Sequence, residues 1–274
     1  MVLAGANAEA FDLMRQTPAE IGPASRTLRP TGQRVYLNNA SKTPGHIPAS
    51  WPAPSDPAAR VCVSIRPEPA AVVSRSLDEA LKAWLSQAPQ TGPPSLLALW
   101  HEASTMKYPI RPDQLRAAQK HIQALVSQNG YNVKVGAIER ATISASSSSI
   151  WMARNLDFYG CDSYDDQSCG TNPVGQLDEF KRLCDALADA GEAIIGITET
   201  NTRCELRRPF WFGAAWRWLK SRQLDTVAGT CFLTCWNPPP AGFESGPWLG
   251  GDWATIDALD AILSEAAALL QARA

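Results

Sequence analysis

The sequence predicts an α/β fold, a (β/α)₈ TIM barrel, in which eight parallel strands alternate with helices. Three observations support this prediction. Eight short apolar runs recur along the 274 residues, helical patterns follow most of them, and the hydrophobic content of 45% is enough for one large core. We therefore expect residues 1–274 to form a single barrel domain.

Each expected strand is a short apolar run bounded by polar or turn-forming residues, as in a parallel strand buried on both faces. The eight runs cover residues 2–6, 24–29, 60–67, 96–101, 133–144, 156–166, 193–198 and 226–237. A doubly wound open sheet is the main alternative. It is disfavoured because no glycine-rich phosphate turn follows the first run, and Gly5 alone is not a dinucleotide-binding fingerprint.

The expected helices carry capping signals. Ser76 is a suitable N-cap, Asn129-Gly130 is a strong stop, and Gly191 closes a later pattern. The helical patterns cover residues 76–88, 112–127, 176–191, 209–221 and 253 to the end. Residues 31–59 are rich in proline and lack such a pattern, so we expect an irregular connection in place of the second helix, folded over the barrel mouth.

Composition excludes several classes of protein. The 25 basic and 27 acidic residues give a net charge of −2 without a basic stripe, which argues against a nucleic-acid partner. No apolar run is long enough to cross a bilayer and the first residues lack the features of a signal peptide, so we expect no membrane association and leave the compartment open. The three histidines lack metal-ligand spacing and no serine elbow is present, so we expect no metal or other cofactor.

The seven cysteines are scattered along the chain. Cys161 and Cys169 flank a loop and could pair, whereas Cys62, Cys184 and Cys231 lie in apolar runs and are better interpreted as buried thiols. The sequence does not decide whether any disulfide forms.

Two of the apolar runs end in a lone glutamate. Glu102 closes the segment SLLALWHEAS, and Glu199 closes EAIIGITETN. Because the carboxyl ends of all strands in a barrel meet at one mouth, we expect both carboxylates to lie in a common cleft. If they are about 5–5.5 Å apart, they can hydrolyse a glycoside by double displacement. The alternative for each is a solvated strand end without a function.

Strand alternation gives an expected direction for each glutamate. Glu102 should point the same way as Ala98 and Trp100, and the second glutamate the same way as Ile195 and Ile197. We expect these four residues to face the barrel interior, which would direct both carboxylates toward the barrel axis.

Three segments of the chain resemble glycoside hydrolase family 26, which holds β-mannanases and relatives. The segments are the His101-Glu102 pair, the TET segment around Glu199, and DFYGCDSYD at residues 157–165. This family belongs to the clan A (β/α)₈ retaining hydrolases, whose acid/base and nucleophile lie on strands four and seven. The resemblance implies that Glu102 is the acid/base and Glu199 the nucleophile, with His101 shaping a neighbouring subsite.

The resemblance also implies roles for two aromatic residues. Tyr164 would match the tyrosine that donates a hydrogen bond to the nucleophile, and Trp236 would match the platform under the reactive sugar. Asp162 precedes Tyr164 by two residues and could help to order the nucleophile, or could simply be a strand end. The family usually carries a tryptophan shortly after its His-Glu pair, whereas this chain offers Tyr108.

Two further residues are candidates for substrate binding. Arg66 ends the third run, where its planar donor group could hold sugar hydroxyls or a carboxylate. Trp248 lies in a glycine-rich segment after the last run, and the chain has ten tryptophans, a residue that sugar-binding clefts use. We expect a monomeric retaining glycoside hydrolase acting on a β-linked polysaccharide or oligosaccharide. The alternative is a catalytically silent, glycan-binding barrel within a larger assembly.

Overall fold

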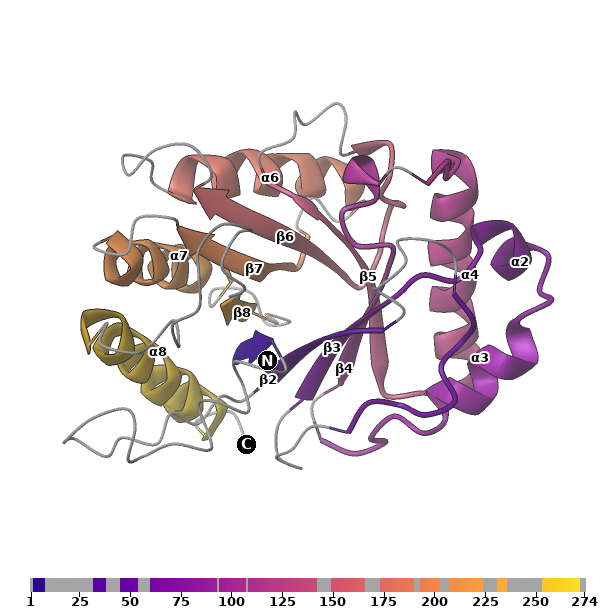
Figure 1. Cartoon of the computed structure of the whole chain (residues 1–274), viewed down its shortest axis with the longest axis horizontal. Coiled ribbons are helices and arrows are strands. Elements are labelled where there is room, and N and C mark those ends of the chain that lie inside the picture. Colours follow the sequence, from indigo (N-terminus) through magenta and orange to yellow (C-terminus); the bar gives the residue numbers. More distant parts are fainter. Residues whose placement is uncertain are drawn as a thin grey trace, which may run out of the picture.

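The computed structural model describes residues 2–7, 32–37, 45–53, 60–92, 94–106, 108–141, 149–165, 173–189, 193–202, 207–223, 231–235 and 253–271. Eight strands form a closed barrel in sequence order, and each is parallel to its neighbours (Figure 1). They are β1 (Val2–Asn7), β2 (Gly32–Tyr36), β3 (Arg60–Ile65), β4 (Ser95–Leu99), β5 (Val133–Arg140), β6 (Phe158–Asp165), β7 (Ile195–Thr202) and β8 (Cys231–Cys235). The closed parallel order confirms the predicted (β/α)₈ barrel.

Helices surround the strands (Figure 1). They are α2 (Pro69–Val73), α3 (Asp78–Leu85), α4 (Pro112–Asn129), α6 (Pro173–Leu187), α7 (Arg208–Gln223) and α8 (Trp253–Gln271), with a short 3₁₀ turn η1 (Ala103–Thr105) after β4. Gly130 ends α4 in the left-handed conformation (φ 68°), which confirms the predicted stop. None of the helices within the described residues is long and apolar enough to cross a bilayer.

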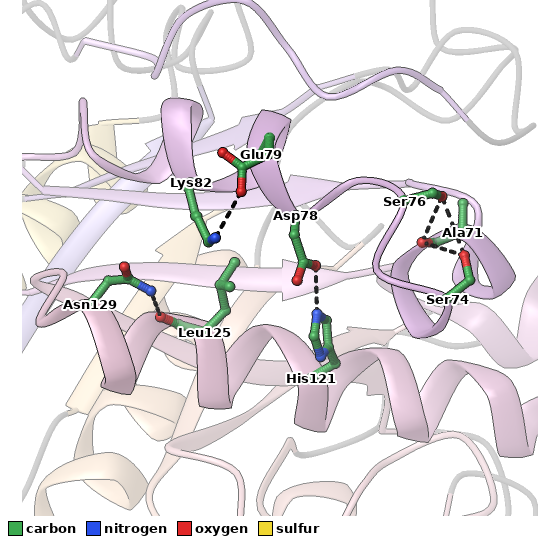
Figure 2. A network of polar contacts seen from close by, with 9 residues as sticks. All are labelled: Ala71, Ser74, Ser76, Asp78, Glu79, Lys82, His121, Leu125 and Asn129. Carbon is green, nitrogen blue, oxygen red and sulfur yellow. Dashed lines mark hydrogen bonds and ion pairs between the residues drawn. The ribbon is translucent and has the colours of Figure 1, made fainter.

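The start of α3 differs from the prediction. Leu77, and not Ser76, is the N-cap residue, and it makes no side-chain capping bond. The reason is the short helix α2, which begins at Pro69 directly after β3. The Ser76 hydroxyl donates to the Ala71 carbonyl oxygen of α2 (3.1 Å) and is therefore used at the end of that helix (Figure 2).

A polar contact joins α3 to α4 on the outside of the barrel. Asp78 Oδ1 lies 2.6 Å from His121 Nε2, and the pair is partly buried between the two helices (Figure 2). On the exposed side of α3, Lys82 forms an ion pair with Glu79 (2.8 Å). The Asp78–His121 contact therefore fixes α3 against its neighbour, whereas the second pair lies at the surface.

The second strand is not where the sequence predicted it. It covers Gly32–Tyr36, whereas the predicted run, residues 24–29, lies outside the described residues. The observed strand carries Arg34, a fully buried cation that an apolar run would not contain. Its guanidinium donates to the Cys62 carbonyl (3.1 Å) and the Ser64 hydroxyl (2.7 Å), so the neighbouring strand β3 accepts two of its hydrogen bonds.

The proline-rich connection between β2 and β3 contains no helix in its described part, residues 45–53. Gly45, the first residue of this part, lies beside the end of β3, since its amide donates to the Arg66 carbonyl (2.7 Å). The connection then packs on α3, since the Trp51 and Trp84 rings are 4.5 Å apart and Trp84 Nε1 donates to Ser50 O (2.9 Å). Residues 50–51 thus lie against a helix and not over the barrel mouth.

One apolar layer lies inside the barrel wall, and a second lies outside it, between the strands and the helices. The inner cluster contains strand residues alone, among them Leu96, Ala98, Ile138 and Phe158. The outer clusters combine strand residues with the helices. Space inside is tight, because a Cβ at Gly160 would lie 2.7 Å from side-chain atoms of β5 and β7.

Of the four residues that were expected to face the barrel interior, Ala98 of β4 does so and the other three do not. Ala98 lies in the inner cluster as expected. Trp100, Ile195 and Ile197 belong instead to the outer clusters, the two isoleucines with residues of α6 and α7. The prediction was wrong because both faces of these strands are apolar, so alternation alone does not say which face lies inside.

Cys161 also faces the outer layer and carries a free, buried thiol, so it is not paired with Cys169, which lies outside the described residues. Its burial raises the pKa of the thiol well above the ordinary value. Cys62 and Cys184 are buried, as expected.

Candidate active site

Glu102 lies on a sharp turn directly after β4. Trp100 and Glu102 both adopt the left-handed conformation, with φ of 51° and 53°. For a non-glycine residue this conformation costs roughly 1–2 kcal/mol, and such strain is concentrated at functional sites. The Glu102 amide donates to Ile138 O of β5 (2.8 Å), and the Thr105 amide donates to Glu102 O (2.9 Å). These bonds hold the turn at the end of the barrel wall.

Trp100 anchors the start of this turn. Its Nε1 donates to Pro67 O (2.6 Å) and its ring stacks on Tyr108, with centroids 5.6 Å apart. Tyr108 Oη in turn donates to Glu68 (3.0 Å). Tyr108, which stands near the family's tryptophan position, is therefore used to pack the turn.

Arginine side chains surround the Glu102 carboxylate. Arg140, at the end of β5, forms an ion pair with it (Nε to Oε1, 3.5 Å), and the Glu102 side chain is 21% exposed. The Arg140 guanidinium also lies 6.0 Å from the centre of the Tyr164 ring. Burial lowers the pKa of Arg66, while the charge of Glu102 acts in the opposite direction. Glu102, Arg140 and Tyr164 thus share one site at the mouth.

His101 is buried beside Arg66 at the same end of the barrel. Its Nε2 lies 3.5 Å from Arg66 Nη2, and the Tyr36 ring meets it edge-on at 4.9 Å. Burial, together with the charges of Arg34 and Arg66, lowers the pKa of His101 well below its ordinary value. The imidazole is therefore neutral at physiological pH.

Three buried nitrogen atoms of this pair lack a hydrogen-bond partner among the described residues: His101 Nδ1, Arg66 Nε and Arg66 Nη1. Because buried polar atoms are nearly always paired, this pair stays the candidate for substrate binding that the sequence predicted. A sugar hydroxyl could accept from the guanidinium or exchange a hydrogen bond with the imidazole.

Asp162 and Tyr164 follow each other on one face of β6. Asp162 is fully buried and accepts a hydrogen bond from the Thr198 hydroxyl of β7 (2.6 Å). Ser163 between them faces the other way, toward Gln176 of α6 (3.0 Å). This alternation, together with the contact between Tyr164 and Arg140, places Tyr164 on the site side of the strand and not toward the helices.

A register shift sets the position of Glu199 in β7. Cys161 is paired with Ile197, but the next pair along β6 is Asp162 with Glu199, so β7 has one extra residue there. The backbone of Glu199 therefore lies beside Asp162. The Glu199 side chain, and Trp236 and Trp248 entirely, lie outside the described residues. The distance between the two carboxylates and the aromatic platform stay predictions.

Sequence reasoning missed three charged residues of this region. Arg34 was missed because its strand was placed too early in the chain. Glu139 and Arg140 end the apolar run of β5, which is the same signal that identified Glu102, yet the run was extended beyond them to residue 144.

Glu139 is buried behind the site, with 1% of its surface exposed. It accepts hydrogen bonds from the Ser104 amide (3.3 Å) and the Ser104 hydroxyl (2.5 Å). The pKa of Glu139 is raised to about 8: burial is the largest cause and the charge of Glu102 acts in the same direction, while the hydrogen bonds from Ser104 oppose them. The carboxyl is therefore mostly protonated at neutral pH.

Comparison with known proteins supports the fold. No protein-family profile matches the sequence, and no curated protein matches it. The structure is similar to a family 26 β-mannanase from Bacteroides ovatus, with a TM-score of 0.56 and 12% identity over 97% of this chain and 89% of that one. It is also similar to a β-mannanase from a symbiotic protist of the termite Reticulitermes speratus, solved with a gluco-manno-oligosaccharide. The TM-score there is 0.54, with 14% identity over 93% of this chain and 86% of that one.

A third similar structure is a family 5 xyloglucan-specific endo-β-1,4-glucanase from a metagenomic library, with a TM-score of 0.54 and 12% identity over 95% of this chain and 96% of that one. Family 26 β-mannanases and other clan A glycoside hydrolases are thus the structural neighbours of this chain. The resemblance predicted from three short motifs is confirmed at the level of the fold.

Proposed function

We propose that this protein is a retaining glycoside hydrolase that cleaves a β-linked polysaccharide or oligosaccharide. The observation that carries the proposal is the position of Glu102, on a strained turn at the carboxyl end of β4, in a closed barrel whose β7 carries Glu199 beside the buried Asp162. Neither the left-handed turn nor the charged surroundings of Glu102 serves packing alone.

In the proposed reaction, the Glu199 carboxylate attacks the anomeric carbon while Glu102 gives its proton to the departing glycosidic oxygen. This step forms a glycosyl ester on Glu199 and leaves Glu102 ionised. Glu102 then removes a proton from water, the resulting hydroxyl attacks the anomeric carbon, and the ester bond to Glu199 breaks. Both glutamates return to their starting states. The predicted separation of the two carboxyl groups is about 4.5–6.5 Å.

Neighbouring residues have supporting roles in this proposal. Tyr164 donates a hydrogen bond to the nucleophile, and Asp162, fixed by Thr198, orders the strand beside it. His101 and Arg66, which lie beside each other at the ends of β4 and β3, bind substrate hydroxyls. Trp236 and Trp248 are proposed as aromatic surfaces under the sugar rings. We propose that the enzyme acts as a monomer and without a cofactor.

The test is a panel of β-mannans, β-glucans, xylans and aryl glycosides, followed by substitutions. Glu199→Ala should abolish turnover of every substrate. Glu102→Ala should spare the first step for activated aryl glycosides, and azide should partly restore the second step. Glu79→Ala, which changes an exposed glutamate on α3, is the matched control and should keep the wild-type rate.

Two further variants test the aromatic roles. Tyr164→Phe should lower turnover by the equivalent of one charge-assisted hydrogen bond, roughly 1.5–3 kcal/mol, with little change in affinity. Trp236→Ala should chiefly weaken substrate binding. If the wild-type protein binds glycans but hydrolyses none, the protein is a glycan-binding barrel and the proposal is wrong.

A further inference from the structure

We propose that Glu139 is a positioning residue for Glu102: its buried carboxyl group, behind the barrel mouth, fixes the turn that carries Glu102 by binding Ser104. This inference rests on the proposed function, because it assigns Glu102 the work of an acid/base. It adds to Glu102, Glu199 and Asp162 a further carboxyl group, one that does not touch the substrate.

The hydrogen bonds of Glu139 all lead to the turn after Glu102. Both of its oxygen atoms are used, Oε1 by the Ser104 amide (3.3 Å) and Oε2 by the Ser104 hydroxyl (2.5 Å). Ser104 follows Glu102 by two residues, within the 3₁₀ turn that has Glu102 as its N-cap residue. The bond from the Glu102 amide to Ile138 O joins the same turn to the same strand, β5. Strand β5 therefore holds the turn at two points, one on each side of Ala103.

Such a hold is needed because the turn is strained. Trp100 and Glu102 both have positive φ, and neither is glycine. A conformation of this kind persists only when its surroundings determine it. Without Ser104 fixed at the far end, the backbone of Glu102 could relax toward a more favourable conformation, and its carboxyl group would move with it. Displacements of about 1 Å at a catalytic group can cost about a hundredfold in rate.

Glu139 lies on the opposite side of the barrel wall from the substrate. It follows Val135 and Ala137 along the face of β5 that packs in the outer layer, whereas Ile138 belongs to the inner cluster. With 1% of its surface exposed, its carboxyl is closed to a ligand at the mouth. Its influence on the reaction must therefore pass through the turn.

The charge state of Glu139 fits this role. Its raised pKa, about 8, keeps it mostly protonated at neutral pH, so burial in the apolar layer does not require a buried charge. Among the described residues, Glu102 is the charged group that acts on it from β4. From β6 its register partner is Cys161, a thiol with a raised pKa. The buried face of α4, Leu115, Ala118, Gln119, Ile122, Leu125 and Val126, carries no charge.

The experiment compares two substrates that differ in their need for the acid. A 2,4-dinitrophenyl glycoside leaves without protonation, whereas the phenyl glycoside of the same sugar requires it. Glu139→Ala should lower kcat/KM for the phenyl glycoside at least tenfold and for the dinitrophenyl glycoside less than threefold. Glu139→Gln keeps an acceptor oxygen for the Ser104 amide, and its NH₂ group can donate to the oxygen of the Ser104 hydroxyl, so it should restore both values to within threefold of wild type.

Ser104→Ala is the second variant and tests the link if Glu139→Ala does not fold. It should lower kcat/KM for the phenyl glycoside more than for the dinitrophenyl glycoside, by a smaller factor than Glu139→Ala does. Gln119→Ala is the matched control. This side chain is also 1% exposed and also makes two bonds, to Trp151 O and from the Ala153 amide, but on α4. Any loss in Gln119→Ala should be equal for both substrates.

Equal losses on the two glycosides in Glu139→Ala or Ser104→Ala, or wild-type values for both, would overturn the positioning role while leaving the proposed function intact. A wild-type protein that hydrolyses neither glycoside, nor any substrate of the panel, would instead remove the proposed function and this inference with it.

Discussion

Replacing Glu139 by glutamine should remove a pH dependence that this buried carboxyl imposes on the stability of the barrel. In the folded chain the pKa of Glu139 is about 8, raised from 4.5 chiefly by burial. Below pH 4.5 the group is protonated in both the folded and unfolded states, and it favours neither. Between pH 4.5 and about 8 the unfolded chain releases the proton while the folded chain keeps it. The free energy of unfolding therefore falls as the pH rises through this interval.

The magnitude follows from the same values. Each pH unit within the interval lowers the free energy of unfolding by up to about 1.4 kcal/mol. From pH 5 to pH 7 the wild-type protein should thus lose up to about 3 kcal/mol that Glu139→Gln does not lose. The hydrogen bonds to Ser104 differ little between acid and amide. Their contribution cancels when the two pH values are compared.

The assay is urea unfolding of wild type and Glu139→Gln at pH 5 and pH 7, followed by circular dichroism. At each pH the free energy of unfolding of Glu139→Gln is subtracted from that of wild type. The two differences, at pH 5 and at pH 7, are then compared. All other titrating groups are shared and cancel. Glu79→Gln is the control: its side chain is 91% exposed, and its surface pair with Lys82 should contribute little to stability at either pH. A change below about 0.5 kcal/mol for Glu139→Gln would refute the assignment of a buried, protonated carboxyl.

Three other experiments test the packing of the barrel, each by chemical unfolding at fixed pH. Gly160→Ala should destabilise the fold by about 1–3 kcal/mol, because the new methyl group meets neighbouring side-chain atoms at 2.7 Å; an unchanged midpoint would show that the interior has space there. Thr198→Val should cost about 1–3 kcal/mol, since it leaves Asp162 without its buried hydroxyl donor, and a neutral effect would contradict that bond. A double-mutant cycle with Asp78→Ala and His121→Ala should give a coupling energy of at least about 0.5 kcal/mol, and additive effects would mean that the contact between α3 and α4 does not contribute.

Much of the fold could be predicted because its signals are local. The apolar runs that became β3 to β8 are bounded by polar or turn-forming residues, and the stop at Gly130 depends on a left-handed position that glycine adopts readily. The prediction failed at β2. There a polar segment with Arg34 forms the strand, and its burial is possible only because backbone and side-chain acceptors of β3 stand beside it.

The candidate site divides in the same way. Position at the end of an apolar run identified Glu102 and Glu199, and a resemblance of short motifs added His101, Asp162 and Tyr164. The same positional signal existed for Glu139 and Arg140, but the predicted run continued past them to residue 144. That Glu139 faces outward into an apolar layer, and so becomes protonated, depends on packing that no local pattern contains.

The sequence by itself thus determined the alternation of strands and helices and the end of the barrel at which its lone carboxylates lie. Tertiary structure alone decided which face of each strand points inward, the register shift that pairs Glu199 with Asp162, and the ionisation of the buried carboxyl behind the turn. The physical reason is that strands in a closed parallel barrel are buried on both sides. The residues on the two faces of a strand are then equally hydrophobic, and only pairing with neighbouring strands fixes which face points into the barrel.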